Sequence, residues 1–567
     1  MNEIALFHQP ESAYGYAIDQ HRYHLRLRVD KKDVIDEIVV LYNDKFLYQK
    51  AQLKLAMKRQ HSDHFFAYYE TIIYLDIPRL AYVFLIKSKG KSLYYSEDGL
   101  TEKYDFVNSF YHHFQIPTNS DADLIRPVTW VNNTVFYQIF VERFAIGNHH
   151  KSMDYINATW DQKPLPKSFY GGDLQGIIDH LDYLIDLGIN AIYLTPINPS
   201  KSNHKYDISD YYDVDQMFGD KATLKNLIDR AHSNGIRVIL DAVFNHCSSE
   251  HPWFVDVINN GKKSPYYDFF FIDGDYPMPN QHPLNYQSFA FTRYMPKLNS
   301  SNLKLQEELI KIGLYWIKEF DIDGWRLDVS DEVAHAFWRK FRTAIKSAKP
   351  EALIIGENWH RAHSWLQGDQ FDSIMNYGYT KAALDYFAWH KLDAEGFVDK
   401  LNNLLMQYSD PINHMMLNLL DSHDTHRFYS ECKEDIDIML QALAFTIFFV
   451  GVPCIYYGTE VPINGGYDPD SRRGMPWNQL NTKNTYWQNV KKLIKIRKSE
   501  KSFNHFDYQI TYENNLIIVQ RGIENDGLIL ILADQSTKVE IKLKEVLFAT
   551  GFDGKSLQKS GFIIARI

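Results

Sequence analysis

Cysteine is scarce in this sequence. The chain contains three cysteines, Cys247, Cys432 and Cys454, an odd number at wide spacings. Such a set provides neither a disulfide framework nor the closely spaced pairs that hold zinc. The scarcity favours a reducing compartment, and we therefore expect a cytoplasmic protein.

An excess of positive charge is also missing. Lys and Arg number 61 against 71 Asp and Glu, which gives a formal net charge of −10. Nucleic-acid-binding surfaces use Lys and Arg to displace the counterions of the phosphates. The acidic balance, together with the lack of a basic run, argues against a nucleic-acid partner.

Long apolar segments of the kind that enter membranes are lacking as well. The N-terminal segment MNEIALFHQPESAYGY contains Glu3 and has no apolar stretch of the roughly 7–15 residues that an export signal requires. The longest apolar run, residues 442–457, contains Gly451 and Pro453 and is shorter than the ~20 residues that span a bilayer. We expect no export signal and no membrane partner, and we interpret the run as a buried helix followed by a buried strand.

Length and aromatic content are what the sequence has in abundance. The chain has 567 residues, of which 45% are hydrophobic and 15% aromatic. A chain of this length is expected to form about three or four domains. Aromatic side chains can pack in cores or stack on sugar rings, and composition leaves both possibilities open.

Residues 1–122 show the two-residue alternation of strands. Tyr23, Leu25, Leu27 and Val29 alternate with polar residues, which is typical of a half-buried strand. Further strands are predicted at Glu37–Tyr42, Phe65–Leu75 and Ala81–Ile86, with a hairpin turn at Lys89-Gly90. The region is predicted to be an N-terminal β-sandwich, and it contains no catalytic constellation.

Residues 123–499 alternate apolar strand-like runs with segments of helical periodicity, the pattern of a parallel sheet. Eight strands are predicted, at Val135–Phe140, Ala191–Thr195, Arg237–Val243, Gly324–Leu327, Ala352–Ile355, Ser373–Met375, Met415–Leu420 and Pro453–Tyr457. Helices are predicted at Leu174–Leu187, Thr223–His232, Gln306–Phe320, Glu332–Ala348 and Asp435–Phe449. Eight such units form an α/β fold, the (β/α)₈ TIM barrel.

Two other parts of the chain complete the predicted organisation. Residues 247–300 are too long for a simple barrel loop, and we expect an inserted subdomain after strand three that covers the active site. Residues 500–567 return to strand patterns, at Leu516–Gln520, Leu528–Ala533 and Val539–Leu543, with turns at Asn514-Asn515 and Asp526-Gly527. This segment is predicted to be a C-terminal antiparallel β domain.

Polar and charged residues follow four of the predicted barrel strands. They are Asp241, Asn245 and His246 in DAVFNH, Arg326 and Asp328 in GWRLD, Glu357, Trp359 and His360 in GENWH, and His423 and Asp424 in DSHD. Any one of them could instead cap the following helix. Because the carboxyl ends of barrel strands meet at one mouth, the whole set favours an active site there.

Two of these carboxylates suit the hydrolysis of a glycosidic bond. Asp328 and Glu357 follow adjacent strands, where they could flank the bond at about 5–5.5 Å, the separation that gives retention of configuration. Arg326 points to the same side as Asp328, and its charge is expected to keep this nucleophile ionised. Glu357, the acid and then the base, needs a raised pKa from apolar surroundings, for which we expect Trp359 to be responsible.

Three further residues are candidates for holding sugar hydroxyls. Asp424 is expected to strengthen its hold as the sugar ring distorts toward an oxocarbenium ion. His246 and His423 are predicted to contact hydroxyls beside it. Either histidine could instead be a buried residue with a purely structural hydrogen bond.

The ordered strings DAVFNH, GWRLDVSDEV, GENWH and DSHDTHR resemble the four signature regions of the α-amylase family of glycoside hydrolases. MPKLN (Met295–Asn299) in the long loop is similar to an additional signature of the neopullulanase, cyclomaltodextrinase and maltogenic amylase group. The N-terminal sandwich, HKYD (His204–Asp207) and GGYDPDSRRGMPW (Gly465–Trp477) also resemble that group. The resemblance covers essentially the whole chain.

The resemblance implies a role for each matching residue. It implies Asp328 as nucleophile, Glu357 as acid and base, and Asp424 as the group that stabilises the transition state. The residues that it implies in substrate binding are Tyr206, Asn245, His246, Arg326, Trp359, His423, Asp468 and Arg472. Among these it implies Tyr206 as the platform under the sugar at subsite −1, Trp359 on the leaving-group side, and Asp468 and Arg472 at the next sugar. For Tyr206 and Trp359, core packing is the alternative.

The sequence differs from the family in the loop that often binds calcium. Relatives often carry Ca²⁺ after strand one in a loop that reads approximately NGDPSND, whereas this sequence reads IGNHHKSMD from Ile146 to Asp154. Of the implied ligands Asn148, Gly172 and Asp173 persist, and Ca²⁺ takes about 6–8 oxygens. We predict weak or absent calcium and no required cofactor. Asn358 and Asp331 also depart from the group beside catalytic positions.

The resemblance implies a retaining, endo-type α-glucan hydrolase. Its expected substrates are the α-1,4 bonds of cyclomaltodextrins and maltooligosaccharides, with pullulan as a further candidate, and its expected product is mainly maltose, with some transglycosylation. Members of the group commonly form homodimers through the N-terminal domain, which covers the partner's active site, so a homodimer is expected here.

Two other functions stay open at this point. An α-glucosidase or oligo-1,6-glucosidase that acts on non-reducing ends would release glucose, although MPKLN and the N-terminal sandwich argue against it. A non-catalytic carbohydrate-binding barrel would have lost a catalytic carboxylate, and all three are present.

Overall fold

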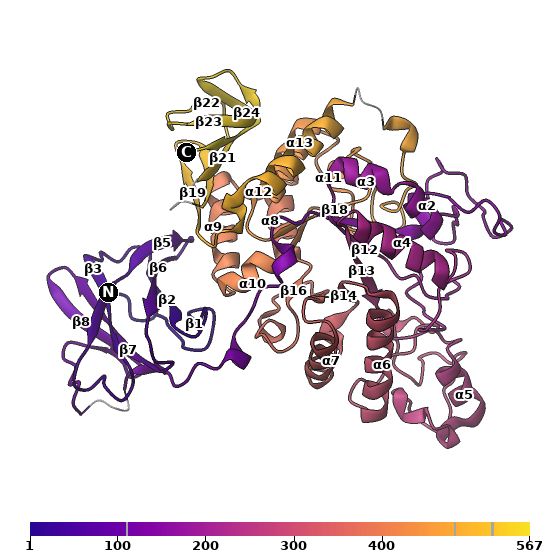
Figure 1. The fold of residues 1–567 in the computed structure, drawn as a ribbon, viewed down its shortest axis with the longest axis horizontal. Helices are drawn as coiled ribbons and strands as arrows, with labels where there is room; N and C mark the ends of the chain where they lie inside the picture. The colour runs from indigo at the N-terminus through magenta and orange to yellow at the C-terminus, as the bar shows by residue number, and fades with distance from the viewer. Residues whose placement is uncertain (109–111, 481–483, 523–526) are drawn as a thin grey trace.

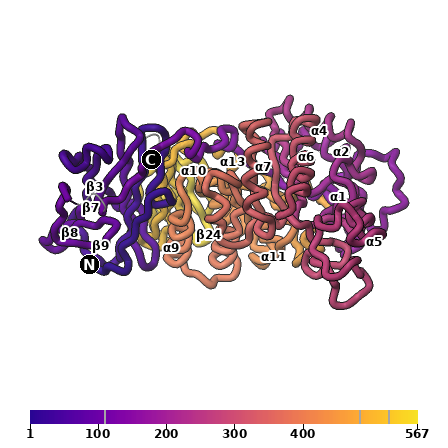
Figure 2. The backbone as a smooth tube through the Cα atoms, turned by 90° about the horizontal axis from the view of Figure 1, so that it is seen from below, coloured from indigo at the N-terminus to yellow at the C-terminus, as the bar shows by residue number. Residues whose placement is uncertain are grey.

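The computed structural model describes residues 1–108, 112–480, 484–522 and 527–567. The molecule is elongated. The N-terminal strands form one end, and the barrel with α5 (Pro252–Asn260) forms the other, as Figure 1 and Figure 2 show from two directions. The C-terminal strands lie beside α12 (Ile436–Phe448) and α9 (Ala394–Leu405).

The N-terminal region forms the predicted β-sandwich. One sheet has the order β1 (Gly15–Ala17), β2 (Arg22–Asp30), β6 (Phe66–Tyr74), β5 (Lys58–Ser62). The other has the order β4 (Leu53–Ala56), β3 (Glu37–Asn43), β7 (Leu80–Ser88), β8 (Lys91–Ser96), β9 (Gly99–Thr101), with β10 (Phe114–Ile116) paired to β7. Their inward side chains, among them Leu25, Val40 and Phe84, form one core. The predicted hairpin turn is present, with Lys89 and Gly90 at φ 51° and 74°.

The barrel prediction is confirmed. Eight parallel strands have the order β16-β15-β14-β13-β12-β11-β18-β17, and a parallel bridge between Met375 and Leu417 joins the two ends. The strands are β11 (Phe136–Ile139), β12 (Ala191–Leu194), β13 (Arg237–Ala242), β14 (Gly324–Leu327), β15 (Leu353–Gly356), β16 (Ser373–Ile374), β17 (Leu417–Leu419) and β18 (Val452–Tyr456). Each lies within about two residues of its prediction, because fully buried apolar runs mark barrel strands clearly.

Two details of the predicted barrel are wrong, and both concern its outer helices. The helix predicted over Leu174–Leu187 is two helices, α2 (Leu174–Asp179) and α3 (Leu181–Leu187), separated at His180. Met415 ends a helix and does not begin a strand. The remaining barrel helices are α1 (Val141–Phe144), α4 (Lys221–Ser233), α6 (Leu303–Phe320), α7 (His335–Ala348), α8 (Tyr377–Ala383), α10 (Asp410–Met415), α11 (Phe428–Glu431) and α13 (Thr485–Ser499).

The C-terminal domain is an antiparallel sheet with one mispredicted strand. Its order is β19 (Tyr508–Glu513), β20 (Leu516–Arg521), β21 (Leu528–Ala533), β24 (Ser556–Arg566), β22 (Thr537–Lys538), with β23 (Glu545–Phe552) paired to β24. The strand predicted at Val539–Leu543 is wrong, because these alternating side chains pack on the core from an irregular segment. The turn at Asn514-Asn515 is present, whereas Asp526 of the other predicted turn lies outside the described residues.

A buried ionic network joins the three domains. Arg26 of β2 contacts Glu70 of β6 (Nε–Oε1 2.6 Å) and Asp410 at the start of α10 (Nη2–Oδ1 3.6 Å). The hydroxyls of Tyr16 and Tyr508 donate to the same Asp410 carboxylate at 3.0 and 3.4 Å. The N-terminal sandwich is therefore anchored on the barrel and on the C-terminal sheet through the fully buried Arg26 and the largely buried Glu70 and Asp410.

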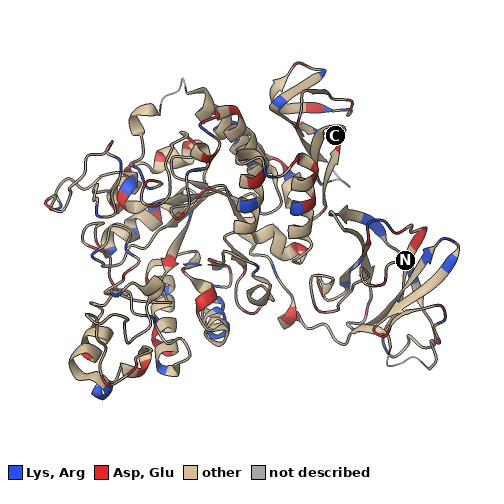
Figure 3. Ribbon diagram, turned by 180° about the vertical axis from the view of Figure 1, so that it is seen from behind, with Lys and Arg blue, Asp and Glu red and all other residues tan. Residues whose placement is uncertain are grey.

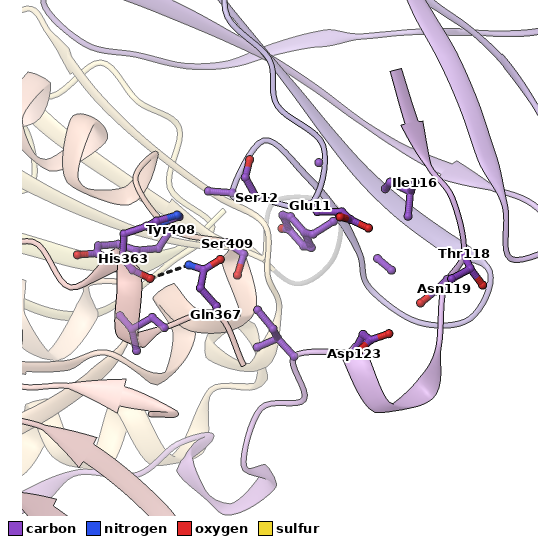
Figure 4. Close-up of a pocket in the computed structure, with 16 residues that line it drawn as sticks. Glu11, Ser12, Ile116, Thr118, Asn119, Asp123, His363, Gln367, Tyr408 and Ser409 are labelled. Carbon is purple, nitrogen blue, oxygen red and sulfur yellow. Dashed lines mark hydrogen bonds between the residues drawn. The ribbon is translucent and has the colours of Figure 1, made fainter. Parts of the chain in front are cut away.

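A cavity of about 420 Å³ opens beside this network, between the N-terminal sandwich and the barrel. Figure 4 shows its polar lining, to which the N-terminal region contributes Ser12 and Asn119 and the barrel contributes Ser409. Across from the sandwich, the amide of Gln367 donates to the carbonyl of His363 at 2.6 Å. The predicted site residues all lie outside this cavity.

Charges are spread over the molecule. Figure 3 shows acidic and basic residues interspersed on helices and strands of all three domains. Within the described ranges, every helix is too short or too polar to cross a bilayer.

Candidate active site

A cavity of about 560 Å³ lies at the carboxyl ends of the barrel strands. Eight of the predicted residues line it: Tyr206, His246, Asp328, Glu357, Trp359, Asp424, Asp468 and Arg472. The other three, Asn245, Arg326 and His423, are fully buried beneath them. The structure thus brings together residues that are separated by up to 266 positions in the chain, from Tyr206 to Arg472.

Arg326 is the centre of the site. Its Nη1 lies 2.9 Å from Asp328 Oδ1 and 3.1 Å from both oxygens of Asp241. Its Nη2 lies 3.0 Å from Glu357 Oε2. One buried guanidinium therefore faces three carboxyl groups, and its single charge cannot balance three negative charges.

The protonation of this cluster follows from that imbalance. Burial first, and the negative charge of Glu357 second, raise the pKa of Asp328 well above its ordinary value, although Arg326 opposes them. Burial likewise raises the pKa of Asp241 to about 6. Arg326 acts on Asp328 in the predicted direction, since its charge lowers the pKa of this carboxyl, but burial and Glu357 act against it.

The sequence places Asp241 at the end of a predicted strand and does not by itself indicate its role. It is the register partner of Arg326 across β13 and β14. Its Oδ2 also accepts hydrogen bonds from the hydroxyls of Tyr193 (2.6 Å) and Tyr206 (2.9 Å). The signal that could have identified it is its position in DAVFNH, on the strand next to GWRLD.

The two oxygens of Asp328 have different surroundings. Oδ1 accepts the hydrogen bond from Arg326, whereas Oδ2 is buried and has no hydrogen-bond partner among the described residues. The residue belongs to the lining of the cavity. An unpartnered carboxylate oxygen is the group that can form a bond to a substrate carbon.

Glu357 is held by donors on both oxygens. The backbone N–H of Val329 donates to Oε2 at 2.9 Å, and the indole Nε1 of Trp359 donates to Oε1 at 3.1 Å. Trp359 itself stacks on Tyr377 with ring centroids 3.9 Å apart. The expectation of an apolar contact from Trp359 is therefore corrected, because its N–H points at the carboxylate.

The backbone after Asp328 adopts an uncommon conformation. Val329 has a φ of 45°, in the left-handed region that β-branched residues rarely occupy. This residue provides the N–H that reaches Glu357. Strain of this kind costs about 1–3 kcal/mol and persists where the surrounding structure imposes it.

Asp424 has its own set of partners. Its Oδ1 lies 3.2 Å from Arg472 Nη2, and its Oδ2 lies 3.1 Å from His423 Nε2. The rings of Tyr206 and His423 are parallel within 2°, and the hydroxyl of Tyr206 lies 2.6 Å from His423 Nε2. Arg472 Nη1 pairs with Asp468 at 2.9 Å. Burial lowers the pKa of His423 well below its usual value, so the ring is neutral.

The inserted subdomain covers one side of the cavity, as expected. Phe289, Thr292, Tyr294 and Met295 from residues 247–300 line it. His246 stacks on Phe289 at 4.8 Å, and burial lowers its pKa to about 3. Phe289 and Tyr294 were missed, because a loop sequence does not reveal which of its side chains turn inward.

Asn245 makes no contribution to the cavity lining. Its Oδ1 accepts a hydrogen bond from Lys297 Nζ at 2.5 Å, and Lys297 also pairs with Glu332 at 2.7 Å. Since Lys297 belongs to MPKLN, this contact ties the inserted subdomain to the segment that follows β13. Asn245 therefore helps to hold the inserted subdomain in place beside the cavity.

In the loop that the resemblance associates with calcium, the implied ligands take part in hydrogen bonds within the protein. Asp173 accepts hydrogen bonds from the backbone of Gly147 and Asn148, at 3.0 and 3.1 Å. The N–H of Gly172 donates to the carbonyl of Glu142 at 3.0 Å. Within the described ranges, no three His, Cys, Asp or Glu side chains are grouped so that they could hold a metal ion. Weak or absent calcium remains a prediction.

Comparisons with known proteins agree with this geometry. Residues 138–517 match the family model described as alpha amylase, catalytic domain, and residues 1–119 match that of the alpha amylase N-terminal Ig-like domain. The chain is 43% identical over 550 residues to a cyclomaltodextrinase of Thermoanaerobacter pseudethanolicus, covering 96% of this chain and 95% of that one. It is 39% identical to a maltogenic alpha-amylase of Bacillus acidopullulyticus, covering 95% and 93%.

A solved structure is similar over almost the whole length. The structure of a cyclomaltodextrinase superposes with a TM-score of 0.92 at 36% identity and covers 99% of both chains. The sandwich, the barrel and the C-terminal sheet are therefore shared as one arrangement. With the family models matching most of the sequence, this chain belongs to the α-amylase family of glycoside hydrolases.

Proposed function

We propose that this enzyme hydrolyses α-1,4-glucosidic bonds with retention, using Asp328 as nucleophile and Glu357 as acid and base. The observation that carries the proposal is that both carboxyl groups contact the buried guanidinium of Arg326 from adjacent strand ends. Each borders the same cavity. Two carboxyl groups with different hydrogen-bond surroundings suit the two roles.

The reaction takes two steps. In the first, Asp328 Oδ2 forms a bond to the anomeric carbon while the bond to the leaving oxygen breaks, and Glu357 gives its proton to that oxygen. In the second, Glu357 takes a proton from water, whose oxygen replaces Asp328 at the anomeric carbon.

Asp424 and its neighbours are proposed to bind the sugar at the cleavage point. Arg472 and His423 hold the carboxylate of Asp424 from two sides, which suits a group that must bind two hydroxyls of a distorted ring. The ring of Tyr206 offers a flat apolar face beside it. Asp468 and Arg472 are proposed to hold the next sugar.

We propose cyclomaltodextrins and maltooligosaccharides as substrates, with pullulan as a further candidate, maltose as the main product, and some transglycosylation. The names of similar proteins support this choice: cyclomaltodextrinase, maltogenic alpha-amylase, and neopullulanase 2 of Thermoactinomyces vulgaris. Chromatography of products from cyclomaltodextrin, maltotriose and pullulan tests it. Maltose is expected, whereas glucose alone from non-reducing ends would contradict the endo-type assignment.

We also propose that the enzyme is a cytoplasmic homodimer. A similar Bacillus subtilis protein is named intracellular maltogenic amylase, and the N-terminal domain resembles that of the dimerising group. The molecular mass in solution tests the dimer. Deleting residues 1–122 should raise starch use relative to cyclomaltodextrin, although the deletion also removes the partners of Asp410, so folding must be verified first.

A further inference from the structure

A buried lysine occupies the loop that the family resemblance associates with calcium. Lys151 Nζ lies 2.8 Å from Asp173 Oδ2, 2.7 Å from the carbonyl of Gly171 and 2.9 Å from the carbonyl of Met217. Its side chain is only 6% exposed. An ammonium group has three N–H donors, and each has an acceptor here.

All the hydrogen-bond acceptor positions of the Asp173 carboxylate are occupied. Oδ1 accepts from the backbone N–H groups of Gly147 (3.0 Å) and Gly176 (2.7 Å). Oδ2 accepts from the N–H of Asn148 (3.1 Å) and from Lys151. A carboxylate offers about four acceptor positions, and four donors fill them.

The remaining implied ligands do not supply the free oxygen atoms that Ca²⁺ would need. The side-chain oxygen of Asn148 accepts from the backbone N–H of His150 at 3.0 Å, and the carbonyl of Gly171, next to Gly172, accepts from Lys151 Nζ at 2.7 Å. Ca²⁺ takes 6–8 oxygens at about 2.3–2.6 Å. Because one positive group already attracts the carboxylate and two carbonyls, the residues present do not fit the ion.

We propose that the ammonium group of Lys151 replaces a metal ion in this loop as a covalently attached cation. It joins three segments at the barrel mouth: residues 146–151 after β11, residues 171–173 before α2, and Met217 after β12. The sulfur of Met217 also contacts Lys205 Nζ at 3.3 Å, and Lys205 directly precedes Tyr206. Lys151 therefore supports the loop that carries the sugar-stacking ring.

The wild-type enzyme provides the first test. Its melting temperature is expected to be the same in excess EDTA and in millimolar CaCl₂, and a calorimetric titration with CaCl₂ alone is expected to give no binding heat. One equivalent of bound Ca²⁺, or a melting temperature that falls with the chelator, would overturn the proposal. Neither readout depends on which glucan the enzyme cleaves.

Two variants test the lysine itself. Lys151→Met is expected to lower the melting temperature equally in EDTA and CaCl₂, because it leaves Asp173 buried without its cation. Lys151→Asp supplies an oxygen in place of the ammonium, and its melting temperature is expected to rise with CaCl₂. Lys167→Met, at an exposed position between Lys151 and Gly171, is the control and should match the wild type.

A Lys151→Met protein as stable as the wild type would overturn the proposal. So would a folded Lys151→Asp protein that does not respond to CaCl₂, because the ammonium would then not be what excludes the ion. If either variant fails to fold, the metal titration of the wild type still decides the proposal.

Discussion

Asp241 and Arg326 are register partners on adjacent barrel strands, and the guanidinium Nη1 donates to both oxygens of the Asp241 carboxylate at 3.1 Å. The same nitrogen holds Asp328. Asp241 thus adds a negative charge directly beneath the proposed nucleophile. It competes for the positive charge that would otherwise stabilise the ionised form of Asp328.

Replacing Asp241 by Asn is expected to move the acid limb of the pH profile of kcat/KM toward lower pH. The negative charge of Asp241 raises the pKa of Asp328, so its removal lowers that pKa and ionises the nucleophile in more acidic solution. The pH profile with a cyclomaltodextrin measures this. Asp210→Asn removes an exposed carboxylate and should leave the limb in place, whereas an alkaline shift for Asp241→Asn would contradict the charge argument.

Glu357→Gln is expected to reduce kcat by about 10²–10⁴-fold, the contribution of a positioned general acid. A substrate with a good leaving group, such as a 4-nitrophenyl maltoside, should recover part of the first step because it needs no proton. Asp328→Asn should abolish turnover of both substrates and still bind the sugar. Equal losses on the activated and natural substrates for Glu357→Gln would count against its role as the acid.

Trp359→Phe is expected to lower kcat by at least about tenfold, since a hydrogen bond to a charged group contributes about 1.5–3 kcal/mol. The substitution keeps a ring that can stack on Tyr377 but removes the N–H donor to Glu357. Tyr377→Phe also preserves the stack and retains the donor, so it serves as the control. If the two variants have the same kcat, the indole N–H does not position the acid.

Glu70→Gln is expected to destabilise the protein at pH 7, by up to about 3–5 kcal/mol for a broken buried pair. Charges and hydrogen bonds from Arg26 and His24 hold the pKa of Glu70 well below its ordinary 4.5, against the effect of burial. The folded state therefore binds this proton more weakly than the unfolded state. The stabilisation is present above pH 4.5 and is lost as the pH falls through the folded pKa.

Thermal unfolding of the Glu70 variant and the wild type from pH 7 to pH 3 checks this, and the gap between them should narrow toward acid. Glu102→Gln is a suitable control, because its pair with Lys91 is 72–73% exposed and exposed pairs contribute little. A gap that widens toward acid would reverse the sign and refute the assignment.

The parts of the fold that the sequence predicted correctly are those with local signals. Apolar runs predicted all eight barrel strands. The residues after these strands indicated Asp328, Glu357 and Asp424, because the strand ends of a barrel meet at one mouth irrespective of the loop sequences. The errors occurred where distant residues intervene. The break at His180 coincides with the packing of its ring on Trp477 at 3.8 Å. Val539–Leu543 alternates because one side is buried, without pairing as a strand.

The sequence by itself determined the class of barrel, the order of its motifs and the identity of the carboxyl groups at its mouth, since spacing and periodicity are properties of neighbouring residues. Only the tertiary structure decided that Arg326 is shared by three carboxyl groups, that the indole of Trp359 donates to Glu357, and that Lys151 lies where a metal ion was implied. These are contacts between side chains from separate loops and strands. Their distances and burial set charge and hydrogen bonding, and no local pattern in the chain encodes them.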